Sequence, residues 1–178
     1  EDIKVKPFYD KEDIAKKYNV DTKASQFKIC QNIYVFDLEK SIEKALDSIN
    51  RGAQSLRFTI PEETVNIAKL LEKLPLEKIS VYFYFNFISI DFVKKINAIA
   101  KEKKATIYCL LDPIGQLAKD GNWYRTQEKN NFDTLEIISK QATSISVISI
   151  NSGLYQNAGA NMVQQIAYSL AHANEYFN

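Results

Sequence analysis

The chain has 178 residues, enough for one modest domain with its own hydrophobic core. Its 23 basic and 22 acidic residues nearly cancel, so no nucleic acid or other polyanion is expected as a partner. No apolar run approaches the roughly 20 residues that a membrane span needs. We expect no signal peptide and no disulfide framework, which favours a cytoplasmic protein.

Strand-like segments alternate with helix-like segments after a polar lead-in, residues 1–26. Five segments are rich in β-branched and aromatic residues and predict strands. They are residues 27–36, 54–60, 79–87, 105–111 and 144–150. The two cysteines, Cys30 and Cys109, fall inside strands and are expected to be buried small hydrophobic residues.

Apolar residues at helical spacing predict a helix after each strand. The first helix is expected to begin at an N-cap, Asp37, and to stop at Gly52. Glu62 and Glu63 suit the first turn of the second. The third runs through Phe92, Val93, Ile96, Ile99 and Ala100, and the fourth holds Phe132, Leu135 and Ile138. The fifth spans Met162 to Tyr176, with Val163, Ile166, Ala167, Leu170 and Phe177 at helical spacing.

Five βα units in sequence predict a parallel sheet with right-handed crossovers. The spacing leaves two folds open, a doubly wound sheet and part of an eight-stranded barrel. The first strand is followed by "YVFDLEKS", which has no glycine, so a dinucleotide or P-loop site is not expected.

Loops after the strands carry the chemistry in a barrel. Asp112, in "LLDPIGQLAKDGNW" after the fourth strand, is interpreted as turn chemistry in preference to a catalytic carboxylate. In "SGLYQNAGA", after the fifth strand, Tyr155, Gln156 and Asn157 are expected to cap the last helix, and Gly159 belongs to the turn. For His172, the only histidine, a surface or helix-end position is favoured.

Four stretches, in order, resemble the methylmalonyl-CoA mutase family, most closely its small subunit. They are "IKVKPFYDKEDI", "FKICQNIYVFDLEKSIEKALDSINRGAQSLRF", "LLDPIGQLAKDGNW" and "SGLYQNAGANMVQQIAYSLAHANEY". The family's catalytic domain is a (β/α)8 barrel, so the resemblance implies a partial barrel over residues 27–178, preceded by an N-terminal arm over 1–26. The lead-in "KKYNVDTKASQ" departs from the family because it lacks the arginine–glycine element that helps hold coenzyme A.

The resemblance also implies that this is the non-catalytic kind of subunit. Asn32 stands where the large subunit has a tyrosine over the acyl group, and Cys30 replaces a nearby arginine. Asp120, beside Lys119, stands near the arginine that grips the substrate carboxylate, and Leu154 replaces a histidine that contacts the substrate. The run "YFYF" in the third strand favours a barrel interior filled with side chains, although coenzyme A threads the family's active barrel.

The implied function is structural support of a large catalytic subunit in a heterodimer. That isomerase interconverts methylmalonyl-CoA and succinyl-CoA with adenosylcobalamin, held by the catalytic chain; no cofactor or metal is predicted in this chain. Two alternatives stay open: an active acyl-CoA isomerase with an unusual site, and a stand-alone α/β interaction module. Five strands cannot close a barrel of eight, so the chain is also expected to self-associate.

Overall fold

The structure is a computed structural model that describes residues 7, 8, 10–13, 27–124 and 128–177. Most of the predicted arm, residues 1–26, lies outside this part; within it, Lys11–Asp13 form a short 3-10 helix, η1. The other elements follow in chain order: β1 (Cys30–Tyr34), α1 (Leu38–Asn50), β2 (Ser55–Ile60), α2 (Ile67–Glu72), β3 (Ser80–Phe85), α3 (Ile90–Lys103), β4 (Thr106–Leu111), α4 (Pro113–Asp120), α5 (Glu128–Gln141), β5 (Ser146–Ile148), α6 (Gly153–Asn157) and α7 (Met162–Glu175).

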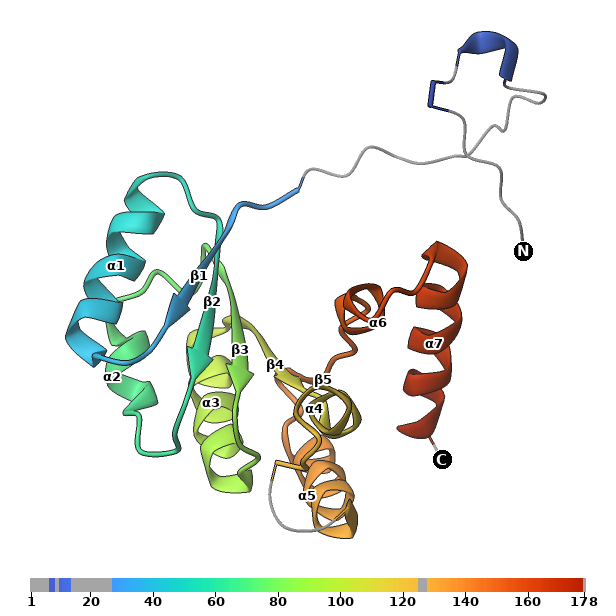
Figure 1. The fold of residues 1–178 in the computed structure, drawn as a ribbon. Helices are drawn as coiled ribbons and strands as arrows, with labels where there is room; N and C mark the ends of the chain where they lie inside the picture. Colours follow the sequence, from blue (N-terminus) through green and yellow to red (C-terminus); the bar gives the residue numbers. More distant parts are fainter. Residues whose placement is uncertain (1–6, 9, 14–26, 125–127, 178) are drawn as a thin grey trace.

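The five strands form one parallel sheet in the order β1-β2-β3-β4-β5. With right-handed crossovers, an unbroken order places every connecting helix on the same face, whereas a doubly wound sheet reverses its order and carries helices on both faces. Here α1, α2, α3 and α5 cover one face (Figure 1). This is the arrangement of a partial (β/α)8 barrel, and it decides between the two folds that the spacing left open.

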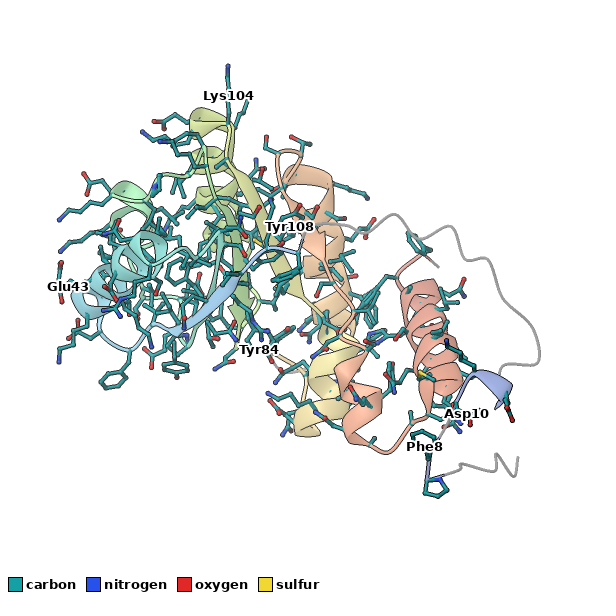
Figure 2. All side chains as sticks on the ribbon, turned by 90° about the horizontal axis from the view of Figure 1, so that it is seen from above. Phe8, Asp10, Glu43, Tyr84, Lys104 and Tyr108 are labelled. Atoms are coloured by element: carbon teal, nitrogen blue, oxygen red, sulfur yellow. The ribbon has the colours of Figure 1, made fainter. Side chains whose placement is uncertain are left out.

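Alternate residues of the central strands build the core between the sheet and these helices. The buried apolar residues of these strands are Leu56, Phe58, Ile60, Val81, Phe83, Phe85, Ile107, Cys109 and Leu111. Figure 2 shows the outer side of the helix layer, where Glu43 and Lys104 project away from this core.

The third strand divides its four rings between its two faces, as the alternation predicts. Phe83 and Phe85 are 0% and 1% exposed in the core, while Tyr82 and Tyr84 lie half-buried on the face without helices. Cys109 is buried as expected. The same expectation is wrong for Cys30, which is exposed because β1 has a neighbour on one side only and Cys30 faces away from the helices.

The observed starts of α1 and α2 are marked by N-cap side chains, and not by acidic residues expected in the first turn. α1 begins where predicted, since the Asp37 side chain accepts a hydrogen bond from Lys40 N, and Gly52 follows its end with φ 105°. The predicted start of α2 is wrong. The Asn66 side chain caps this helix, so Glu62 and Glu63 precede it.

Residues 112–123 do not form a simple loop after β4. α4 begins at Pro113, directly after its N-cap Asp112, and ends at Asp120, followed by the C-cap Gly121, whose φ is 72°. The predicted turn after β5 likewise contains the short helix α6. Both segments hold glycine and are brief, so they lack the long apolar repeat that marks a helix in the sequence.

The limits of α7 agree with the sequence, but the expected capping residues are wrong. Its N-cap is Asn161, in a reciprocal capping box with Gln164, and not Asn157 or its neighbours. Its apolar residues lie on the exposed side, and its buried residue is polar, His172. Among the described helices, none has the length and apolar character to cross a membrane.

Candidate functional site

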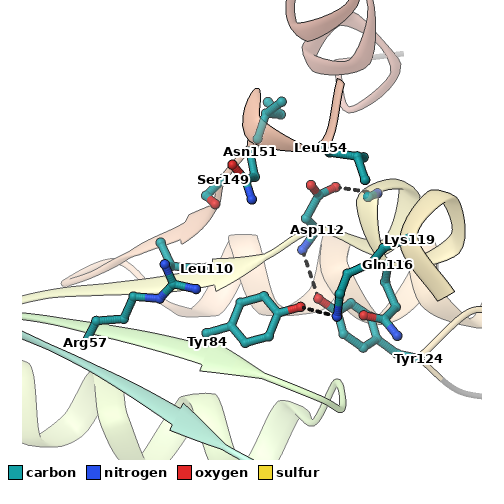
Figure 3. Close-up of a pocket in the computed structure, with 12 residues that line it drawn as sticks. Arg57, Tyr84, Leu110, Asp112, Gln116, Lys119, Tyr124, Ser149, Asn151 and Leu154 are labelled. Atoms are coloured by element: carbon teal, nitrogen blue, oxygen red, sulfur yellow. Dashed lines mark hydrogen bonds between the residues drawn. The ribbon is translucent and has the colours of Figure 1, made fainter. Parts of the chain in front are cut away.

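A cavity of about 230 Å³ lies at the carboxyl ends of the strands. This is the end where the loops of a (β/α)8 barrel carry their chemistry. Its walls come from β2, β3 and β4, from α4, and from the segment between β5 and α6 (Figure 3). The lining residues are Arg57, Tyr84, Leu110, Asp112, Gly115, Gln116, Lys119, Tyr124, Ser149, Ile150, Asn151 and Leu154.

Asp112 occupies a fixed position in the wall because its carboxylate is held from several sides. Its Oδ1 atom accepts hydrogen bonds from Gly115 N at 2.8 Å and from the Tyr176 hydroxyl at 2.6 Å. His172 Nε2 lies 2.8 Å from the same oxygen. Asp112 therefore caps α4 and also links α7 to the end of β4.

His172 connects this carboxylate to a second tyrosine. Its side chain is 2% exposed, and its Nδ1 atom lies 2.9 Å from the Tyr155 hydroxyl. With a single ring proton on Nε2, His172 would donate to Asp112 and its Nδ1 atom would accept from the Tyr155 hydroxyl. The expectation of a surface position for His172 is thus wrong, although it does lie in the last turn of α7. The expectation that Tyr155 caps the last helix is also wrong, because Asn161 is the N-cap of that helix and the Tyr155 hydroxyl is hydrogen-bonded to His172.

The tyrosines around Asp112 act as hydrogen-bonding groups. Burial, followed by the hydrogen bond to Asp112, raises the pKa of Tyr176 well above its ordinary value. Burial is also the main cause that raises the pKa of Tyr124, whose oxygen accepts from Asp112 N at 3.3 Å. Both phenols therefore stay protonated at neutral pH, and neither is available there as a base.

Positive charge collects on the other side of the cavity, around Tyr84. The Arg57 guanidinium carbon lies 5.4 Å from the centre of the Tyr84 ring, and Lys119 Nζ lies 5.8 Å from it. Lys119 Nζ also donates to the Tyr84 hydroxyl at 3.4 Å and pairs with Asp120 at 3.4 Å. Among the described residues, no carboxylate oxygen lies within 4.0 Å of the Arg57 side-chain nitrogens.

The structure brings only some of the residues singled out in the sequence to this cavity. Asp112 and Leu154 line it. Asp120 lies just beyond Lys119 at the end of α4, where its carboxylate accepts from Gln116 Nε2 at 2.6 Å. Asn32 and Cys30 lie on β1 and do not line the cavity.

Asn157 and Gly159 belong to the corner between α6 and α7, outside the cavity lining. Asn157 is the last residue of α6, and Gly159 has φ 94°, a conformation that favours glycine.

Sequence reasoning missed Arg57 and Tyr84 as site residues. A signal existed for Arg57: it stands alone between Leu56 and Phe58, so the strand period of two sends it to the face opposite the core. That face carries the cavity.

The sequence profile of the methylmalonyl-CoA mutase family matches residues 61–178, about two thirds of the chain. This chain belongs to the methylmalonyl-CoA mutase family. Among proteins of curated function, none matches it. The match covers β3, β4 and β5 with the helices that follow them, and therefore most of the cavity wall of this mutase chain.

Mutases of this family use adenosylcobalamin, and the described residues do not fit that cofactor. An imidazole that ligates cobalt needs a ring nitrogen free to reach the metal. Both nitrogens of His172, the only histidine, already face protein groups, Tyr155 and Asp112. The sequence also lacks the aspartate–x–histidine–x–x–glycine pattern of the family's cobalamin domain.

Proposed function

We propose that this chain is part of the barrel domain of a non-catalytic mutase subunit, whose role is to pair with and support a catalytic chain. That partner would carry out the interconversion of methylmalonyl-CoA and succinyl-CoA. The family membership supports the reaction class. The non-catalytic role is supported by the residues at the positions that the resemblance assigns to substrate binding.

The observation that carries the proposal is Asp120. The resemblance places Asp120 near the arginine that grips the substrate carboxylate. In this chain the position holds an exposed carboxylate, already bonded to Gln116 and Lys119. Two carboxylates repel each other, so this group opposes the substrate it would need to hold. Leu154, at the position of the contacting histidine, adds an apolar wall with no hydrogen bond to offer.

One observation favours the alternative of an active isomerase. Arg57 and Lys119 supply positive charge to the same cavity from other positions. A cation alone does not orient a reacting acyl group, because radical rearrangement also needs polar groups fixed over the reacting carbon atoms. The cavity has a leucine at the position of the substrate-contacting histidine, so we prefer the supporting role.

The proposal is tested by turnover and by assembly. We expect the purified chain, supplied with adenosylcobalamin and methylmalonyl-CoA, to form no succinyl-CoA. We expect it to form a stoichiometric complex with a catalytic mutase chain, measured by light scattering. The matched control is the catalytic chain alone in the same assay. Turnover by this chain without the partner would overturn the proposal, and so would failure to bind the partner.

A further inference from the structure

A separate groove lies between α5 and the C-terminal end of α7, and it shares no residue with the cavity described above. Its volume is about 400 Å³. Five apolar side chains line it: Phe132 and Leu135 from α5, Ile148 from β5, and Tyr176 and Phe177 at the end of α7. The Phe132 and Tyr176 rings lie 6.1 Å apart, so the two helices approach each other here. We name this surface the α5–α7 groove.

The apolar side chains of the α5–α7 groove reach the solvent. Phe177 is 86% exposed, and Phe132 and Tyr176 are only partly buried. Leu135 is buried beneath them. Exposed aromatic rings of this kind are enriched in protein interfaces, because each supplies a large contact area at low entropic cost. The groove therefore offers an apolar floor that nothing in the described part of the chain covers.

The rim of the groove is acidic. It carries Asp133, Glu136 and Glu175, all exposed, and no lysine or arginine, although basic and acidic residues are balanced over the whole chain. Glu136 pairs with Lys140 one helical turn further on. For Asp133 and Glu175, no basic nitrogen of the described residues lies within 4.0 Å of the carboxylate. Two carboxylates are thus free to pair with a cation from outside the chain.

The position of Glu175 adds to this charge. It is the last residue of α7, where the helix dipole is negative and disfavours a carboxylate. A cation placed beside Glu175 would relieve both the dipole and the neighbouring acidic groups. Charge complementarity therefore selects a basic partner for the groove.

The shape of the groove selects a helix. Its wall on α5 consists of Phe132, Leu135, Glu136 and Ser139, which stand at i, i+3, i+4 and i+7 and so share one helix face. The end of α7 forms the opposite wall. A groove between two helices, with an apolar floor and a charged rim, suits an amphipathic helix that lays its apolar face on the floor.

We propose that the α5–α7 groove binds a basic amphipathic helix of a partner protein. Its apolar side chains lie against Phe132 and Phe177, and its lysines or arginines lie beside Asp133 and Glu175. The apolar floor supplies affinity, while the rim rejects acidic helices and so sets the choice of partner. The proposal does not rest on the supporting role, because binding of such a helix requires neither turnover nor a catalytic mutase chain.

The test is fluorescence anisotropy of a labelled synthetic peptide added to the full chain. The probe contains leucine and lysine only, with the leucines on one helix face, and has about 15 residues, enough to form a helix. We expect it to bind, and to bind more weakly as salt is raised, because the rim charges are exposed and are screened. A second peptide with glutamate in place of lysine keeps the same apolar face, and we expect it not to bind measurably.

Variants of the groove separate its two parts. Asp133→Asn together with Glu175→Gln should weaken binding of the leucine–lysine peptide by about threefold to tenfold, the effect of losing two exposed ion pairs. Phe177→Ala should weaken it by about fivefold or more, because it removes an aromatic anchor. All three side chains are exposed, so these variants should fold as the unmodified chain does.

Glu43→Gln together with Glu77→Gln is the matched control, because it removes the same charge from two exposed positions outside the groove. It should leave binding unchanged. The proposal is overturned if the leucine–lysine peptide does not bind, if the leucine–glutamate peptide binds as tightly, or if the groove and control variants bind alike. It is also overturned if the peptide fails to bind while the groove variants abolish self-association, which would assign the groove to a second copy of this chain. None of these outcomes measures turnover or binding of a mutase chain, so they are distinguishable from failure of the supporting role.

Discussion

The carboxylate of Asp112 contacts groups from several parts of the chain that are distant in sequence. It links the first turn of α4 to His172 and Tyr176 on α7, about 60 residues further along the sequence. Gly115 makes this possible: a Cβ atom there would lie 2.1 Å from Asp112 Oδ2. Any side chain at position 115 must therefore displace the carboxylate from its partners.

Gly115→Ala is accordingly expected to destabilise the protein by about 1–3 kcal/mol, the usual cost of forcing an extra group into a packed site. Chemical denaturation measures this. The control is a double-mutant cycle with Asp112→Ala, which removes the obstructing carboxyl group. In that background the alanine should cost much less. An equal cost in both backgrounds would contradict the explanation.

The buried tyrosines predict a loss of stability in alkali. Burial is the main cause that raises the pKa of Tyr124 and of Tyr176. In the unfolded chain these phenols lose their protons near pH 10, while the folded protein retains them. The unfolded state then binds fewer protons, so the free energy of unfolding falls as pH rises through this range. Below about pH 9 the two tyrosines add no pH dependence.

Tyr176→Phe should make this alkaline decline shallower, measured by urea denaturation between pH 8 and 11. Burial also raises the pKa of the Cys109 thiol, which gives a similar decline from about pH 8.5, so the comparison uses the difference between the two proteins. Identical slopes for the variant and the unmodified chain would show that Tyr176 ionises equally easily in both states.

At the scale of elements, the strands were largely predictable because their patterns are local. The period of two in β2 and β3 correctly separates the core face from the cavity face. α4 was missed although Asp112, Pro113 and Gly121 are good start and stop signals, because only a few residues lie between them. His172 was misplaced for another reason: its partners come from elements that no local pattern brings together.

α7 shows the limit of periodicity more directly. Its spacing correctly predicted a helix with one apolar face, but spacing alone does not say what covers that face. Gln165, Ser169, His172 and Tyr176 share the opposite face, and the last two bind Asp112. The polar contacts thus orient the helix, and its apolar residues point outward.

The packing of β3 gives a prediction for the sheet. Phe83 is 0% exposed, with the Phe58 ring 5.8 Å away and the Phe85 ring 6.0 Å away. Phe83→Ala is expected to cost about 3–5 kcal/mol in the free energy of unfolding, since it leaves a cavity among packed rings. Tyr82→Ala, one residue earlier, is the matched control: its ring stacks on Tyr108 on the half-exposed face and should cost less. A loss below about 1 kcal/mol for Phe83→Ala would contradict the core assignment.

For the whole molecule, the described part of the chain has open surfaces of two kinds. β1 pairs only with β2, and β5 pairs only with β4, so each leaves one edge without a strand. Unpaired edges favour pairing with another chain. The second surface, the apolar face of α7, consists of Met162, Val163, Ile166 and Leu170, which are 80%, 76%, 64% and 66% exposed. Contiguous exposed apolar residues of this size promote association.

We therefore expect the chain to associate in solution, so that light scattering gives a mass at or above twice 20.4 kDa. If α7 is the main contact, the double substitution Ile166→Glu and Leu170→Glu should shift the mass toward that of one chain, because two buried carboxylates would oppose the contact. Ile137→Glu, an exposed isoleucine on α5, is the matched control and should leave the mass unchanged. If the α7 variant still associates, the strand edges are the main contact. A stable single chain before any substitution would show that neither surface is sufficient to drive association. In that case the polar contacts of α7 hold the helix in place while its apolar face remains in water.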